Sequence, residues 1–274
     1  MTKLDIGRAW EEAMALLSAN KDVVLIVAAV FFFLPSAIST LAMPQDSEWI
    51  AMLESGAEPE PEMLLAAMNA WFAEVWWIFL LVTFFQMVGV LGLLALLRHN
   101  GRPTVGEALG FGAKAFLPYL AAQIIASLVF VAAMFIVLLI GGLLGTVGII
   151  IAVPLAIAIA VYLGLKFSLV SPVIAIEKNF NPIGVLQRSW KLTKGNSLRL
   201  FFLFALIIVV VAVIYLLTGM VSSLFSLGGE QVGLFASAIL GALVSMVFTT
   251  IFMAVLAAVH RQLSGHVAVG DTFD

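Results

Sequence analysis

Six apolar runs divide this sequence, and each of them is long enough to cross a lipid bilayer. They occupy residues 23–43, 75–97, 117–140, 146–170, 198–220 and 234–259. A helix needs about 20 consecutive apolar residues to span the hydrocarbon layer. Over the whole chain 63% of the residues are hydrophobic and 11% are charged, which is more apolar surface than a soluble domain can bury. The runs therefore predict an all-α polytopic membrane bundle of six transmembrane helices.

The break between the third and fourth runs is short. It consists of the stretch GGLLGT, from Gly141 to Thr146, and contains no charged residue. One uninterrupted helix across both runs would far exceed a single bilayer crossing. Since glycines mark turns, the stretch predicts a tight helical hairpin.

The basic residues predict which side of the membrane each segment faces. If the first residues are cytoplasmic, the inner segments are 1–22, 98–116, 171–197 and the stretch from His260 onward. Eleven of the 13 Lys and Arg residues then fall within these segments, and the other two, Lys166 and Arg199, lie just before and just after the segment 171–197. The first outer segment, 44–62, contains acidic residues and no basic residue. Because basic residues accumulate on the cytoplasmic side, both ends of the chain are predicted to be cytoplasmic.

Three inner segments predict amphipathic interfacial helices, at 5–18, 104–115 and 182–194. Asp5 is the expected N-cap of the first, and Thr104 with Glu107 has the spacing of a capping box. Asn181 followed by Pro182 predicts the start of the third. Each helix begins with an aliphatic residue followed by Gly. This pattern suggests a threefold internal repeat of one interfacial helix and one transmembrane hairpin.

No catalytic, metal or cofactor site is predicted from the residue types present. The chain contains no Cys, so thiol chemistry and Cys-ligated metals are excluded. Its three histidines, His99, His260 and His266, lie at or beyond the predicted cytoplasmic membrane edge. We expect them to be solvated or to reach the interface. No nucleic-acid partner is predicted.

The candidate lipid-binding site lies on and just after the third interfacial helix. Its basic residues are Arg188, Lys191, Lys194 and Arg199. Basic residues beside a membrane attract anionic lipid by about 1 kcal/mol each. The alternative is that these charges only set the orientation of the chain.

Three intramembrane polar residues and one row of small residues are further candidates. Lys166 is expected to reach the headgroups by snorkelling, with a functional cavity as the alternative. Gln86 and Gln123 are expected to link helices, or else to line a polar path. The small residues recur every four positions on the sixth helix and predict close helix packing: Ser237, Gly241, Ser245 and Thr249.

The stretch 171–196, SPVIAIEKNFNPIGVLQRSWKLTKGN, carries a family resemblance. The residues concerned are Pro172, Glu177, Pro182, Leu186, Arg188, Ser189, Trp190, Leu192, Thr193 and Gly195. They resemble the membrane domain attached to some glycerophosphodiester phosphodiesterases, which also occurs as stand-alone bacterial membrane proteins. The resemblance implies an all-helical protein of the bacterial inner membrane. It does not imply an enzyme, because the phosphodiesterase chemistry belongs to a separate soluble domain that this chain is not expected to contain.

Two functional hypotheses follow from these patterns. The first is a non-enzymatic membrane protein that engages anionic phospholipid and supports membrane organisation or a partner protein. The second is a transporter or channel for a small or lipid-like solute, using Gln86, Gln123 and Lys166. An enzyme is a third class, which would require a titratable pair in one pocket. The sequence leaves open a membrane protein partner or a homo-oligomer.

Overall fold

The computed structural model describes residues 3–44, 47–55, 60–98 and 104–265. Every regular element in these residues is a helix, and six helical spans are long and apolar enough to cross a membrane. The predicted all-α bundle of six spans is therefore confirmed. The chain is an integral membrane protein.

The first span is built from three consecutive pieces that follow the short helix α1 (Ile6–Ala19). These are α2 (Lys21–Ala28), the π-helical turn η1 (Ala29–Phe33) and α3 (Leu34–Ala42). Pro35 lies in the first turn of α3. A proline ring clashes with the carbonyl group four residues earlier, and the wider π turn just before Pro35 relieves that crowding. The span therefore continues past the proline.

The next elements are α4 (Glu48–Glu54) and the second span, α5 (Pro61–Leu96). The helix of the second span begins at Pro61 rather than at residue 75, so it also includes much of the chain between the first two apolar runs. Trp49 of α4 packs edge-on against Trp71 of α5, with 5.8 Å between the ring centroids. The aromatic contact holds α4 against the N-terminal part of α5.

The third and fourth spans form a hairpin of α6 (Val105–Leu143) and α7 (Gly145–Phe167). The turn uses Gly145, whose φ of +71° favours glycine. A Cβ on Gly148 would run into the backbone of Gly141, so the two helices approach closely beside the turn. The tight hairpin predicted at residues 141–146 is confirmed.

One predicted boundary is wrong. The segment 104–115 is not a separate interfacial helix, because α6 runs without a break from Val105 to Leu143 and includes Pro118. The capping box of Thr104 and Glu107 is present and starts this long helix. A proline inside a helix removes one hydrogen bond and can kink the helix, and α6 continues past Pro118.

The remaining elements are α8 (Val170–Glu177), α9 (Pro182–Thr193), α10 (Ser197–Ser226) and α11 (Glu230–Ser264). The predicted N-caps are confirmed, since the Asp5 carboxylate accepts the Arg8 N–H and the Asn181 side chain accepts the N–H groups of Ile183 and Gly184. The sequence of a short helix followed by two spans occurs at α1 and again at α9. In the middle unit the short helix is fused into α6.

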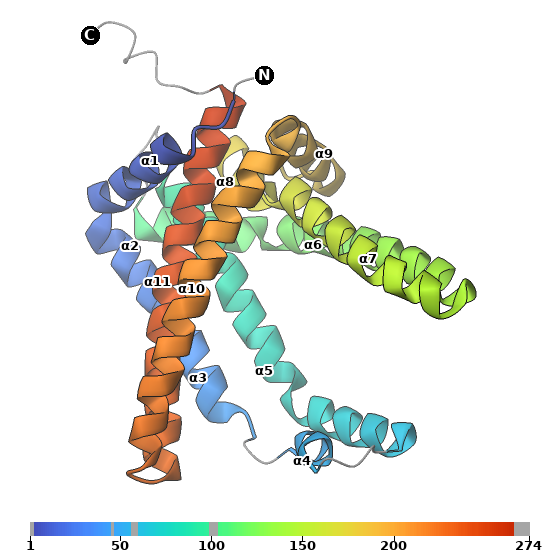
Figure 1. The fold of residues 1–274 in the computed structure, drawn as a ribbon. Coiled ribbons are helices and arrows are strands. Elements are labelled where there is room, and N and C mark those ends of the chain that lie inside the picture. The colour runs from blue at the N-terminus through green and yellow to red at the C-terminus, as the bar shows by residue number, and fades with distance from the viewer. Residues whose placement is uncertain (1–2, 45–46, 56–59, 99–103, 266–274) are drawn as a thin grey trace, which may run out of the picture.

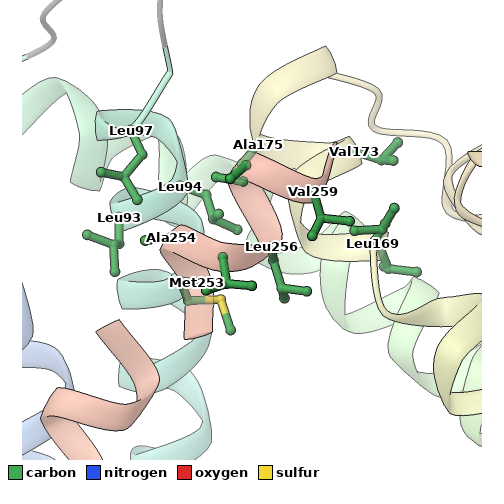
Figure 2. Packing of buried hydrophobic residues seen from close by; sticks show 14 of the residues in the cluster. Leu93, Leu94, Leu97, Leu169, Val173, Ala175, Met253, Ala254, Leu256 and Val259 are labelled. Carbon is green, nitrogen blue, oxygen red and sulfur yellow. The ribbon is translucent and has the colours of Figure 1, made fainter. Parts of the chain in front are cut away.

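The core lies at one end of the bundle. Figure 1 shows α1, α8 and α9 gathered at this end, together with both ends of the described chain, while the hairpins α6–α7 and α10–α11 diverge from it. Leucines of α5, Val173 of α8 and Val259 of α11 meet in the interior (Figure 2). The three side chains Leu94, Val173 and Val259 are completely buried. The diverging parts of the hairpins expose their large apolar side chains, as expected for lipid-facing helices.

Candidate functional site: the junction at the basic end

The charges of the described residues are distributed unequally between the two ends of the bundle. The basic residues lie at the end of the bundle where α1, α8 and α9 gather (Figure 1). We call this end of the molecule the basic end. Its cations are Lys3, Arg8, Lys21, Arg98, Lys114, Lys166, Lys178, Arg188, Lys191, Lys194, Arg199 and Arg261. The opposite end carries Glu48, Glu54, Glu60, Glu62, Glu74 and Glu230. No basic residue among those described lies at that acidic end.

An ion cluster joins three helices at the basic end. Glu177, the last residue of α8, accepts hydrogen bonds from Arg188 of α9, whose Nε lies 3.0 Å from both carboxylate oxygens. His260 of α11 lies on its other side, with Nε2 2.9 Å from Oε1 of Glu177. The carboxylate is 23% exposed and the imidazole only 2%. The cluster thus fixes α8, α9 and α11 relative to one another.

The burial of His260 corrects the prediction that this residue is solvated. The sequence places it beside Arg261 at the end of an apolar run, which is typical of an interfacial residue. In the fold α8 returns over the last turns of α11 and covers the imidazole. The partner, Glu177, is 83 residues away in the sequence, so local spacing gave no signal of the pair.

Glu177 and His260 form a titratable pair, which is the arrangement that an enzyme hypothesis requires. A general base must reach a substrate directly or through one water molecule. With 2% of its side chain exposed, His260 offers no surface to a substrate, and Nδ1, its second ring nitrogen, is buried with no hydrogen-bond partner. The geometry suits a structural hydrogen bond better than an acid–base site.

Ser189 links α9 to the bend between α7 and α8 through two hydrogen bonds. Its hydroxyl donates to the backbone oxygen of Lys166 over 2.7 Å and accepts the N–H of Leu169 over 3.2 Å. These two backbone groups have been freed by the break between the helices. Thr193, one turn later, donates its hydroxyl to the backbone oxygen of Ser189. Ser189 of the RSWKLT stretch therefore satisfies backbone groups at a helix junction, while the Thr193 bond lies within α9.

Lys166 lies among aromatic rings beside this bend. Its Nζ is 5.3 Å from the ring centroid of Tyr162 and 5.5 Å from that of Trp190, within the range of cation–π attraction. The residue as a whole is 3% exposed. The predicted snorkelling side chain is thus covered by protein, and the aromatic faces replace part of its hydration.

A second set of bonds ties the beginning of the chain to the same junction. The N–H of Leu4 donates to Oδ1 of Asn196 over 2.9 Å, and the Leu4 backbone oxygen accepts from Arg199 over 2.7 Å. The N–H of Asp5 donates to the Gln262 side chain of α11. These contacts place the start of α1 beside the first turn of α10 and the last turn of α11.

The four predicted lipid-binding residues do not have equivalent surroundings. Lys191 and Lys194 are exposed on α9. Arg199 is exposed at the start of α10 and is bonded to Leu4. Arg188 is paired with Glu177 and is 39% exposed. Arg188 is therefore the least available of the four to a lipid headgroup.

The three intramembrane polar residues do not meet. Gln123 lies 3.4 Å from the Tyr119 hydroxyl on its own helix, Lys166 lies between aromatic rings, and Gln86 is exposed on α5. In the described part of the chain, no hydrogen bond joins any two of these three side chains. The structure therefore gives these three side chains separate surroundings.

The predicted packing row on α11 is displaced. Ser237 is exposed and a Cβ on Gly241 would meet nothing within 4 Å, whereas Ala238 and Ala242 are buried. Close contact at Ser237 and Gly241 is therefore wrong for the single chain, while Ser245 and Thr249 are half-buried. A shift of one residue rotates the contact face by about 100° on a helix of 3.6 residues per turn, and Ala is small enough to serve the same purpose.

Comparison with known proteins identifies no matching family model, no matching curated protein and no matching solved structure. The class that the fold and the junction define is an integral membrane protein with six helical spans and a packed, basic end. The residues of this chain are the basis for assigning its function.

Proposed function

We propose that this is a non-enzymatic protein of the bacterial inner membrane that engages anionic phospholipid at its basic end. In this role it supports membrane organisation or assists a partner protein. The observation that carries the proposal is the separation of charge, with all described cations at the basic end and only carboxylates at the other end. Positive charge marks the cytoplasmic side of a membrane protein, where anionic lipids supply a negative surface potential.

The exposed cations of the basic end provide the attraction. Lys191 and Lys194 project from α9, and Arg199 follows one turn after that helix. Each basic residue beside an anionic surface contributes about 1 kcal/mol, so the three together favour anionic over neutral lipid by a few kcal/mol. Pairing of Arg188 with Glu177 leaves that residue a structural role, and we exclude it from the lipid-binding set.

Lipid retention tests the proposal directly. The purified protein, given equal amounts of phosphatidylglycerol and phosphatidylcholine, should retain phosphatidylglycerol preferentially in native mass spectrometry. Replacement of both Lys191 and Lys194 with Gln should reduce this preference. The matched control replaces Glu60 and Glu62 with Gln at the acidic end and should leave it unchanged. Equal retention of both lipids by the unaltered protein would refute the proposal.

The transport hypothesis finds less support in the arrangement of residues. It relied on Gln86, Gln123 and Lys166, which lie apart and have local partners or lipid-facing surroundings. The enzyme hypothesis has one titratable pair, Glu177 and His260, in which the imidazole is buried. We therefore expect the purified protein not to hydrolyse glycerophosphodiesters. Turnover lost on replacing His260 would contradict this.

We also propose kinship with the membrane domain found in some glycerophosphodiester phosphodiesterases. Its support is the resemblance of residues 171–196. In this chain the helix junction depends on Glu177, Arg188 and Ser189, so retention of these residue types would have a physical reason. A member of that family whose structure lacks this junction would argue against the kinship.

A further inference from the structure

A groove lies under α1, between α10 and α11. Its volume is about 730 Å³, and its lining is entirely apolar side chains and one glycine. Gly7 and Trp10 of α1 cover one end, while Leu206 and Val210 of α10 face Leu243 and Val247 of α11 along its length. Sites for small molecules and cofactors have volumes of roughly 300–1,000 Å³, so the groove can hold more than a single side chain.

The length of the groove matches one leaflet of a bilayer. On α10 its lining extends from Leu203 to Ile214. At 1.5 Å per residue, this stretch of helix is about 16 Å long. The hydrocarbon layer is about 30 Å thick, so the groove extends from the basic end to about the middle of the membrane. An acyl chain of a phospholipid in that leaflet has the same direction and extent.

A cation stands at the end of the groove where a phosphate would lie. Arg199 is one turn before Leu203 on α10, it is exposed, and one of its N–H groups donates to the Leu4 backbone oxygen. A guanidinium carries five N–H donors, so others remain for a phosphate oxygen. Of the carboxylates at the start of the chain, Asp5 caps α1 and Glu12 pairs with Arg261, while Glu11 is exposed on α1. Trp10, which is 44% exposed, suits the membrane–water interface.

We propose that this groove binds one acyl chain of an anionic glycerophospholipid whose phosphate is bound by Arg199. The inference rests on the proposed function and makes it specific, because it assigns one bound lipid to the α1–α10–α11 groove, in addition to the general attraction that the cations of α9 provide. The groove supplies apolar contact for the chain, and Arg199 selects the charged headgroup. Binding would also hold α1 against the two spans.

Two substitutions test whether the lipid binds in the groove or elsewhere on the protein. Val210→Trp places a large ring in the groove and should reduce retained phosphatidylglycerol at least fivefold. Its control is Val209→Trp, an adjacent exposed position that does not line the groove and should have no effect. Arg199→Gln should reduce phosphatidylglycerol retention about fivefold, as expected for the loss of one lipid-facing charge, and should leave phosphatidylcholine retention unchanged.

Photo-crosslinking of the unaltered protein gives a second readout that does not depend on a variant folding correctly. Phosphatidylglycerol with a photoreactive group in its acyl chain should label peptides of α10 and α11 that contain the groove. Preferred retention of phosphatidylglycerol with labelling elsewhere, and with Val210→Trp behaving like Val209→Trp, would overturn the groove assignment alone. Equal retention of both lipids by the unaltered protein would overturn the proposed function as well.

Discussion

At the basic end Leu94 of α5, Val173 of α8 and Val259 of α11 are completely buried, whereas at the turn of the α6–α7 hairpin Leu143 and Leu144 are 78% and 71% exposed. The helices of both regions are strongly apolar in sequence. The difference lies in the polar groups, because the basic end also contains the Glu177 cluster, Ser189 and Asn196. Lipid tails are as apolar as leucine, so packing and hydrogen bonds, rather than hydrophobicity, hold membrane helices together. The comparison shows that the helices of this bundle pack together at the end where polar side chains link them.

Loss of the ion cluster should have the largest effect on stability. Glu177→Ala leaves Arg188 and the buried His260 without their shared acceptor. Removing one partner of a buried pair costs up to 3–5 kcal/mol, and with 23% of the carboxylate exposed we expect about 2 to 3 kcal/mol. Thermal unfolding in mild detergent measures the change. Glu74→Ala, an exposed carboxylate at the acidic end, is the control and should stay within about 0.5 kcal/mol of the unaltered protein.

The second-largest effect on stability is expected from removing a packed leucine, and it should differ between the two regions. Leu94→Ala removes a side chain with no exposed surface, while Leu128→Ala removes one that is 64% exposed. The first leaves a cavity and should cost about 2 kcal/mol, the low end of the usual range because the alternative environment is lipid. The second should be nearly neutral. Equal destabilisation by the two changes would mean that the hairpins pack together in the membrane.

A smaller effect is expected from a single added methyl group. On Gly112 a Cβ would press against the Val88 backbone of α5, while on Gly142 of the same helix it would meet open space. Overpacking costs about 1 to 3 kcal/mol, so Gly112→Ala should destabilise by about 1 kcal/mol. Gly142→Ala should be neutral or slightly stabilising, since Ala favours a helix. The order of the two melting temperatures is the measurement, and a reversed order would argue against contact between α5 and α6 at Gly112.

Much of the fold could be predicted because it depends on local patterns. Apolar length predicts the six spans, and the caps at Asp5, Thr104 and Asn181 predict where three helices start. The continuous α6 was missed because the amphipathic segment 104–115 and the apolar run from residue 117 differ in composition. Such a difference indicates a change of environment along a helix, and it does not show where the helix ends.

The site could be predicted only in part. The charge pattern indicates a basic end, and the family resemblance selected Glu177, Arg188 and Ser189 without assigning them contacts. The pairing of Glu177 with His260 joins residues 83 positions apart, and the groove under α1 joins three helices from opposite ends of the chain. Such contacts follow from the arrangement of elements in space, which periodicity in one sequence does not report.

The central claim is that the packed, basic end of the molecule faces the cytoplasm, where it meets anionic lipid. Because the chain contains no Cys, single cysteines can report the exposed face without background. In intact cells with a permeable outer membrane, a charged maleimide should label Ser55→Cys, next to α4 at the acidic end. It should label Gln187→Cys, on α9, only after the inner membrane is opened. Labelling of Gln187→Cys in intact cells would contradict the account, because the basic end would then face away from the cytoplasm.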